Sequence, residues 1–214
     1  MYRAKVVSLD LCREGVGAAE VASAIREGAL IVYPAETMYG LGGDGLDPAV
    51  WRKIRAVKGR GADKPFLLLL DEPERWRLVA SRFPAAARRL ADRYWPGPLT
   101  LVLPAISGSP AAGPRGGVAV RVPDRDWLRG WVRLADRPLI STSANRDGGE
   151  PEGDPDRLTI LFGEEADLIV AGPRFDPVGP PSALVDATFD PPRLLRAGPF
   201  PIEGFEEGVE GGSP

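Results

Sequence analysis

Glycine and proline limit the fold of this sequence more than any other feature, since 26 glycines and 23 prolines occur among 214 residues. Both residue types end helices and strands and favour turns. A chain interrupted this often must be built from many short elements joined by tight loops. We find no internal repeat, and 43% hydrophobic residues are enough for a sizeable core. The sequence therefore predicts a globular protein of one large domain or two small ones.

Apolar runs and helical periodicities alternate along the chain. The clearest helix has Asp47 as its N-cap and Pro48 at its first position, and it ends at Gly59. An earlier helix ends at Gly28, where a left-handed cap is wanted. This alternation predicts a mixed α/β fold with a large mixed sheet. The expected helices cover residues 18–27, 47–59, 84–93, 124–134 and 154–162, and the expected strands cover residues 4–9, 29–33, 66–70, 99–103, 118–122, 139–141, 168–170, 183–185 and 193–195.

Histidine is absent from the whole chain, and Cys12 is the only cysteine. These absences exclude Ser-His-Asp and Cys-His catalysis, histidine-ligated metal sites, internal disulfides and four-cysteine metal sites. Any chemistry must therefore use carboxylates, hydroxyls, backbone amides, lysine, arginine or a bound ion.

The net charge of the chain is −3 at pH 7. This acidic balance argues against broad binding to a phosphate backbone, although a local basic pocket is still compatible with it. The longest apolar runs, such as residues 66–70, fall far short of the roughly 20 residues that a membrane helix needs, and no signal-peptide core follows the N-terminus. We therefore expect a cytoplasmic protein without a membrane span.

Residues 40–45 match the Gly-x-Gly-x-x-Gly pattern of dinucleotide-binding turns. In those turns the chain leaves a strand directly and opens a helix, so that the pyrophosphate lies at the helix N-terminus. Here residues 34–39 separate the match from the preceding strand, and the next helix begins only at Asp47. We interpret the match as a coincidence, and the chain contains no P-loop motif.

Three cations, Lys58, Arg60 and Lys64, lie within seven residues on a glycine-containing loop between a helix and an apolar strand. Such a loop can bring its charges together on a multiply charged anion. The alternative is that Lys58 and Arg60 only complement the negative carboxyl end of the helix dipole. The loop by itself leaves both interpretations open.

Polar residues follow two of the expected strands. Residues 141–145 hold three hydroxyl groups and Asn145, the only asparagine in a chain without glutamine. Glu36 and Thr37 follow the strand at residues 29–33, and the end of a strand is a usual location for ligand contacts in open α/β sheets. Asn145 could instead cap its own loop, and Thr37 could be an ordinary turn residue.

Arg121 lies inside the apolar strand expected at residues 118–122, and Arg196 follows the apolar pair Leu194 and Leu195. Arginine is seldom buried without a partner, so each side chain needs a carboxylate or phosphate from the protein or from a ligand. One such arginine would indicate an internal salt bridge. Two of them, together with the basic loop, favour an anionic ligand. The aromatic and proline-rich corner at residues 94–100 is assigned a structural role at a sheet edge.

Seven motifs follow one another along the chain: Pro34–Gly42, Lys58–Arg60, Tyr94–Thr100, Val118–Pro123, Ser143–Asn145, Ser182–Asp186 and Leu195–Gly198. Taken in order, they make the sequence resemble the YrdC-like family of threonylcarbamoyl-AMP synthases. The resemblance implies a single YrdC-like domain over residues 1–200, of the short form without the extra C-terminal domain. It implies a twisted, open sheet of parallel and antiparallel strands with flanking helices and a basic central cavity. Residues 201–214 are acidic and glycine-rich and are expected to form a poorly ordered tail.

The resemblance also implies a reaction in which L-threonine, bicarbonate and ATP give L-threonylcarbamoyl-AMP and pyrophosphate. Mg²⁺ would arrive with ATP, and the product would pass to the machinery that transfers the threonylcarbamoyl group to tRNA. No resident metal is implied. The implied residues are Thr37, Arg121 and Ser141 for threonine, Arg60, Lys64, Gly117, Ser143, Asn145, Pro151, Ser182 and Arg196 for ATP, and Lys58 and Arg60 for catalysis.

The sequence departs from the family pattern at several positions. Ala35 replaces a threonine, Lys64 replaces a neutral amide, and Leu69 stands where many relatives have a histidine near the threonine. Residues 183–184 are Ala-Leu in place of Thr-Val. Two alternatives therefore stay open: a nucleotide-binding or double-stranded-RNA-binding module of the same fold, with weak tRNA binding, and a paralogue that carbamoylates another acceptor.

Overall fold

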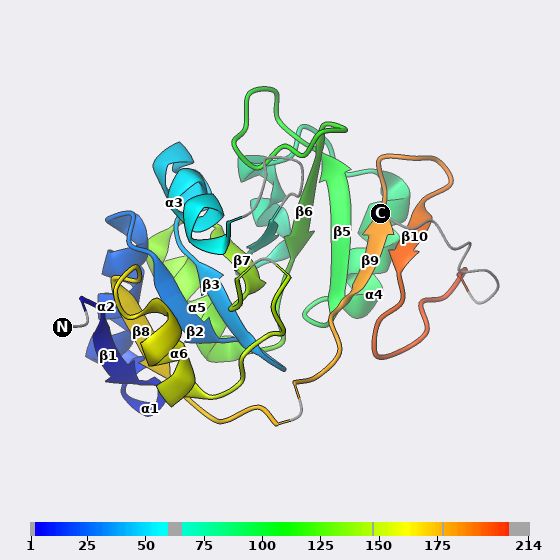
Figure 1. Cartoon of the computed structure of the whole chain (residues 1–214). Helices are drawn as coiled ribbons and strands as arrows, with labels where there is room; N and C mark the ends of the chain where they lie inside the picture. The colour runs from blue at the N-terminus through cyan, green and yellow to red at the C-terminus, as the bar shows by residue number, and fades with distance from the viewer. Residues whose placement is uncertain (1–2, 60–65, 147, 177, 206–214) are drawn as a thin grey trace.

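The computed structural model describes residues 3–59, 66–146, 148–176 and 178–205. Strands in these residues are β1 Lys5–Ser8, β2 Ile31–Pro34, β3 Tyr39–Gly42, β4 Leu67–Leu69, β5 Leu99–Pro104, β6 Gly117–Arg121, β7 Leu139–Ser143, β8 Leu168–Ala171, β9 Ala183–Asp186 and β10 Arg193–Arg196. They form one sheet in the order β1-β8-β2-β3-β7-β4-β6-β5-β9-β10 (Figure 1). The pairs β1/β8, β2/β8, β4/β6 and β5/β9 are parallel, and the other neighbouring pairs are antiparallel. The mixed α/β fold predicted from the sequence is thereby confirmed.

The helix at residues 47–59 shows why the sequence signals for helix ends were reliable. The Asp47 carboxylate accepts a hydrogen bond from Ala49 N at 2.7 Å, and Gly59 takes the left-handed conformation with φ of 66°. Within the described residues, no helix combines the length and hydropathy needed to cross a bilayer. The helices are α1 Leu9–Cys12, α2 Gly15–Arg26, α3 Pro48–Lys58, the 3₁₀-helix η1 Pro73–Leu78, α4 Ala85–Tyr94, α5 Asp126–Ala135 and α6 Pro155–Phe162.

Helices cover both faces of the half of the sheet that contains β2 and β8. In β2, Val32 belongs to a first hydrophobic cluster together with residues of α3, α4 and α6, whereas Ile31 and Tyr33 belong to a second cluster with α1, α2 and α5. β4 divides in the same way, with Leu68 in the first cluster and Leu69 in the second. Burial on both faces explains why these strands are continuous apolar runs.

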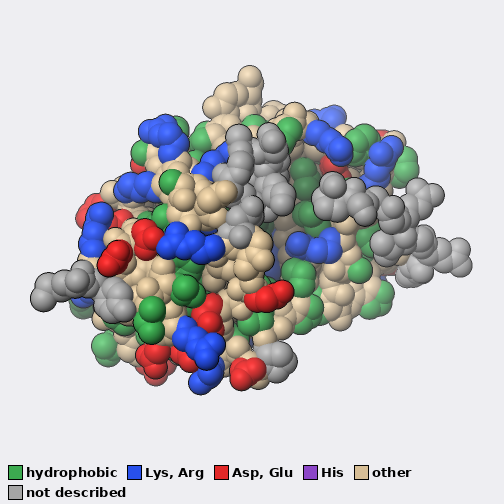
Figure 2. Space-filling view, viewed as in Figure 1, with side chains coloured by type: hydrophobic (Ala, Val, Ile, Leu, Met, Phe, Trp, Pro, Cys, Tyr) green, Lys and Arg blue, Asp and Glu red, His purple; other side chains and the backbone are tan. Residues whose placement is uncertain are grey.

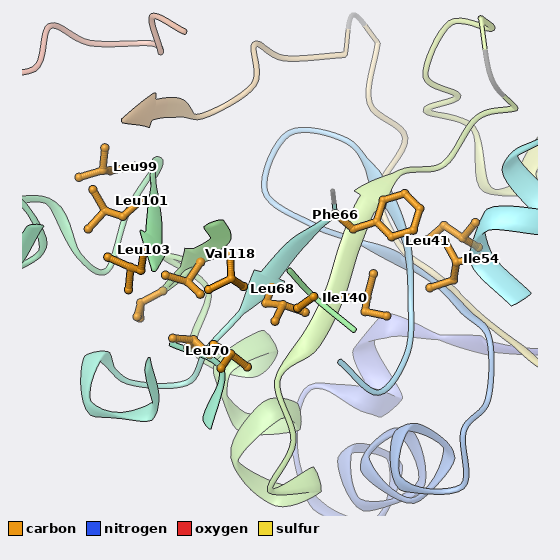
Figure 3. Packing of buried hydrophobic residues seen from close by; sticks show 14 of the residues in the cluster. Leu41, Ile54, Phe66, Leu68, Leu70, Leu99, Leu101, Leu103, Val118 and Ile140 are labelled. Carbon is orange, nitrogen blue, oxygen red and sulfur yellow. The ribbon is translucent and has the colours of Figure 1, made fainter. Parts of the chain in front are cut away.

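The other half of the sheet is covered by helix on one face. Leu99, Leu101 and Leu103 of β5 belong to the first cluster together with residues of α4. Figure 3 shows that buried side chains of β6, β4, β7 and β3 continue this cluster across the sheet. Their neighbours Thr100 and Val102 point to the opposite face and line a cavity. On the sheet face that carries the second cluster, the helices therefore cover the strands only as far as β4. The surface of β6, β5 and β9 beyond it on that face is open and can form a site.

Strand β3 is the main element that the sequence analysis missed. Its glycines disfavour a strand when judged by propensity alone, but it pairs with β2 on one side and β7 on the other. Gly42 lies so close to β7 that an added Cβ would be 1.9 Å from Ile140 O. The Gly-x-Gly-x-x-Gly match therefore begins inside a strand, not in a turn from strand to helix. The short helices α1 and η1 were also not expected.

The residues that follow Arg196 continue to pack on the domain. The Phe200 ring stacks on Tyr94 with centroids 5.4 Å apart, and Ile202 is 3% exposed within the first cluster. Glu203 N donates a hydrogen bond to Tyr94 Oη at 3.0 Å. The first residues of the expected tail are thus part of the packed structure, whereas residues 206–214 lie outside the described residues.

Candidate active site

A cavity of about 680 Å³, here called the central pocket, opens on the face where the helical cover stops. Figure 2 shows basic and acidic side chains gathered around a hollow on this side of the molecule. Segments that are far apart in the sequence meet there because β2, β3, β4, β6 and β7 lie close together in the sheet. The described residues that line the central pocket are Ala35–Gly40, Phe66, Leu67, Arg121, Ser141–Ser143, Glu150, Pro151, Val178–Ser182 and Arg196.

The turn between β2 and β3 supplies one wall of the central pocket. Ala35 N donates to Met38 O at 2.8 Å, which closes the hairpin and directs Glu36 and Thr37 to the pocket. The segment that leads from β8 to β9 lies against this turn, since Gly179 N donates to Thr37 O at 3.0 Å. A Cβ on Gly179 would be only 2.6 Å from the Thr37 Cβ, so the contact requires glycine.

Arg121, at the end of β6, is a partly buried cation held by two protein groups. Its Nε donates to Gly97 O at 2.8 Å, and its Nη2 forms an ion pair with Glu36 Oε2. The other Glu36 oxygen, Oε1, accepts from Asp124 N at 2.7 Å. Burial lowers the pKa of Arg121, and the Glu36 carboxylate opposes this shift. The carboxylate partner that the sequence required for Arg121 is therefore provided by the protein.

Ser141 in β7 lies near Arg121 because both strands pair with β4 between them. Leu67 is the register partner of Ser141, and Leu69 is the register partner of Arg121. Beneath them, Tyr33 is fully buried, and its hydroxyl donates to Ile140 O at 3.2 Å. Burial raises the pKa of Tyr33 above its ordinary value, against a hydrogen bond with the Ser141 side chain. Leu69 is 3% exposed, on the sheet face of Arg121 but below the pocket lining.

Lys58 and Asn145 lie outside the lining of the central pocket and hold one of its loops. Lys58 is 2% exposed, and its Nζ donates to Ser143 O at 2.7 Å, Asn145 O at 3.0 Å and Asn145 Oδ1 at 2.9 Å. Asn145 Nδ2 donates to Gly149 O and to Arg146 O. The Ser143 hydroxyl, which does reach the pocket, donates to Asn145 Oδ1. These contacts agree with the alternative in which the Asn145 side chain caps its own loop.

Ser182 and Arg196 form the opposite end of the central pocket. The Ser182 hydroxyl lies 2.8 Å from the buried Thr100 hydroxyl, and Ser182 O accepts from Arg196 Nε at 3.0 Å. Burial lowers the pKa of Arg196, and the positive charge of Arg121 adds to this effect. A second cavity of about 490 Å³ adjoins this end, shares Leu67 and Arg196 with the central pocket, and is lined by Gly117.

The charges on the described lining of the central pocket are balanced. Arg121 and Arg196 face Glu36 and Glu150 across the same space. Arg60 and Lys64, which the sequence analysis assigned to ATP, lie outside the described residues, so the predicted basic character stays a prediction. No group of three or more Asp, Glu or Cys residues that could hold a metal occurs in the described part of the chain.

Most of the implied site residues meet in one place. The structure brings Thr37, Arg121, Ser141, Ser143, Pro151, Ser182 and Arg196 to the central pocket and Gly117 to the adjoining cavity. Sequence reasoning gave no role to Thr100 and the Gly97 carbonyl, and it named Glu36 only as a possible ligand contact, whereas all three hold predicted residues in place. The demand of Arg121 for a carboxylate could have identified Glu36. Nothing in the sequence pairs Thr100 with Ser182, because strand register alone brings them together.

The sequence of this chain is similar to those of known proteins. A model of the Sua5/YciO/YrdC family, described as "Telomere recombination", matches residues 23–198. A protein from Pyrococcus abyssi named threonylcarbamoyl-AMP synthase is 37% identical over 185 residues, which are 86% of this chain and 54% of that protein. This chain therefore spans about half the length of that relative. A protein of the same name from Thiobacillus denitrificans is 35% identical over 175 residues, which are 81% of this chain and 91% of that protein.

The fold is also similar to that of solved structures. The crystal structure of P. abyssi Sua5 complexed with L-threonine aligns with a TM-score of 0.78 at 35% identity, covering 85% of this chain and 54% of that one.

Proposed function

Because the chain belongs to the Sua5/YciO/YrdC family, we propose that it is a threonylcarbamoyl-AMP synthase, which converts L-threonine, bicarbonate and ATP to L-threonylcarbamoyl-AMP and pyrophosphate. One observation carries the proposal. Residues that the motifs assign to two different ligands, such as Thr37 and Ser182, line a single pocket although more than 140 residues separate them in the sequence. A reaction that joins an amino acid to a nucleotide needs both substrates side by side.

Threonine binds at the end of the pocket formed by Thr37, Arg121 and Ser141. A guanidinium can pair with a carboxylate through two parallel hydrogen bonds. Arg121 Nη1 has no hydrogen-bond partner among the described residues and is available for such a pair. Leu67 and Phe66 provide apolar surface beside it for the substrate methyl group.

ATP binds at the other end, where Ser143, Pro151, Ser182 and Arg196 line the pocket and Gly117 lines the adjoining cavity. Arg60 and Lys64 add positive charge to the triphosphate in this proposal. Lys58 and Asn145 act indirectly, because they hold the loop that carries Ser143.

The proposed chemistry needs no histidine. The threonine amine attacks bicarbonate to give a carbamate and water. A carbamate oxygen then attacks the α-phosphorus of ATP, the bond between the α-phosphorus and the bridging oxygen breaks, and pyrophosphate leaves with that electron pair. Transfer at phosphorus depends mainly on positioning and on neutralising negative charge. Mg²⁺ enters with ATP, and the product passes to the enzymes that modify tRNA.

The test is an assay of purified protein with ATP, bicarbonate and each amino acid in turn, in which pyrophosphate and the adenylate are measured. Turnover with threonine, and not with serine or glycine, is the expected result. Turnover with a different amino acid identifies a paralogue with another acceptor. An absence of pyrophosphate with every amino acid, combined with tight RNA binding, refutes the proposal in favour of an RNA-binding module.

Two variants test the division of the pocket. Arg121→Ala should raise the KM for threonine by roughly ten- to a hundredfold, since a charge-assisted hydrogen bond contributes about 1.5–3 kcal/mol, and should leave ATP binding nearly unchanged. Arg196→Ala should weaken ATP binding and leave the KM for threonine nearly unchanged. Equal losses for both substrates in either variant contradict the assignment.

A further inference from the structure

The two arginines of the central pocket differ in how their charge is compensated. The Arg121 guanidinium is paired with the Glu36 carboxylate, and both side chains are partly buried, with 11% and 14% of their surfaces exposed. Arg196 donates to the Ser182 carbonyl and has no carboxylate within salt-bridge distance among the described residues. One end of the pocket therefore carries a neutral ion pair and the other end a full positive charge.

Glu36 also fixes which edge of Arg121 faces the pocket. A guanidinium offers its donors along edges, and Nε and Nη2 lie on the same edge. That edge is occupied by Gly97 O and Glu36 Oε2. Glu36 is itself held from the far side by Asp124 N, at 2.7 Å from Oε1. Nη1, which has no hydrogen-bond partner among the described residues, is the guanidinium nitrogen left for a ligand.

From these contacts we infer that Glu36 determines the ligand selectivity of the Arg121 end of the pocket: it makes this subsite accept a zwitterionic amino acid and discriminate against phosphate dianions. The inference rests on the proposed function for the identity of the amino acid. The Glu36 carboxylate repels any ligand with net negative charge. An amino acid carries one ammonium and one carboxylate at neutral pH and so has no net charge. Glu36 attracts its ammonium group while it repels its carboxylate, and the two effects largely cancel.

This selectivity matters because ATP and pyrophosphate occupy the same cavity system. Without Glu36, Arg121 would be a second uncompensated cation beside Arg196 and would attract phosphate groups into the amino-acid subsite. Coulomb's law gives a dianion about 6 Å from the Glu36 charge roughly a tenfold gain in affinity when that charge is removed, even at the dielectric constant of water. A zwitterion at the same place changes little.

The experiment measures equilibrium binding of threonine and of inorganic phosphate to the full chain by calorimetry at low ionic strength. In Glu36→Gln, which keeps the shape of the side chain, the ratio of phosphate Kd to threonine Kd should fall about tenfold. Glu36→Asp keeps the charge and should restore most of the ratio. Glu74→Gln, which removes the same charge from exposed η1 outside the pocket lining, is the matched control and should leave the ratio unchanged.

A double variant locates the effect. If phosphate gains its affinity at Arg121, the gain must disappear in Glu36→Gln/Arg121→Ala. An unchanged ratio in Glu36→Gln, or a gain that persists in the double variant, overturns the inference. Melting temperatures of all variants show whether each protein is folded, and if Glu36→Gln is not, Glu36→Ala removes the same charge and takes its place. Because binding is read without turnover, a protein that makes no adenylate but shows the ratio change refutes the proposed function alone.

Discussion

Replacing Lys58 by methionine tests whether Lys58 stabilises the loop at residues 143–145 or contacts the phosphates of the nucleotide. Methionine matches the length and apolar character of the lysine stem and removes the ammonium group. In the folded protein that group is buried and donates to three oxygens of the loop from Ser143 to Asn145. If these bonds hold the loop, the Lys58→Met protein must have a lower free energy of unfolding than the wild type even when no nucleotide is present.

The decrease in the free energy of unfolding depends on which loop oxygens keep another hydrogen-bond donor when the Lys58 ammonium group is removed. Ser143 O keeps a hydrogen bond from Asn145 N at 3.0 Å, and Asn145 Oδ1 keeps the one from the Ser143 hydroxyl. Among the described residues, only Asn145 O would be left without a hydrogen-bond donor. An unsatisfied buried polar group costs about 1–3 kcal/mol, so we expect Lys58→Met to lower the free energy of unfolding by about 2 kcal/mol. For a chain of this size the melting temperature should fall by roughly 4–8 °C.

Urea denaturation of the ligand-free protein measures this loss, with Lys53→Met as the matched control. Lys53 lies on the same helix, is exposed, and donates to a single carbonyl, Gly28 O at 2.9 Å, so its loss should stay within about 0.5 kcal/mol. A Lys58→Met protein as stable as the control, with ATP binding abolished, would show that Lys58 contacts the nucleotide and that the reasoning is wrong.

Two further changes test other contacts. Gly179→Ala would place a Cβ 2.6 Å from the Thr37 Cβ and should cost about 1–3 kcal/mol in urea denaturation, whereas Gly130→Ala, whose Cβ meets no heavy atom within 4 Å, should not destabilise; equal effects would contradict the contact. Burial raises the pKa of Asp44 against the hydrogen bond from Leu46 N, so wild-type stability falls as pH rises through the window between the unfolded and the folded pKa. Asp44→Asn should therefore gain stability relative to the wild type as the pH rises through that window, and a relative stability that declines there would refute the assignment.

Local signals were sufficient for most of the fold. The cap at Asp47, the glycine at position 59 and the alternation of apolar runs each depend on neighbouring residues, and the structure bears them out. Strand β3 was not predicted because its glycines are required by contacts across the sheet. A Cβ added to Gly42 would lie 1.9 Å from Ile140 O in β7, so only glycine fits there. A propensity cannot report a contact with a segment that lies about a hundred residues away.

The sequence by itself excluded histidine chemistry, placed hydroxyls after strands and arginines in or after apolar runs, and showed that Arg121 needs an anionic partner. Only the tertiary structure decided that this partner is Glu36, that Lys58 binds the loop of Asn145, and that the site lies where the helical cover of one sheet face stops. The physical reason is that charge compensation and burial depend on distances between strands. Those distances follow from the strand order and register, which no local pattern contains.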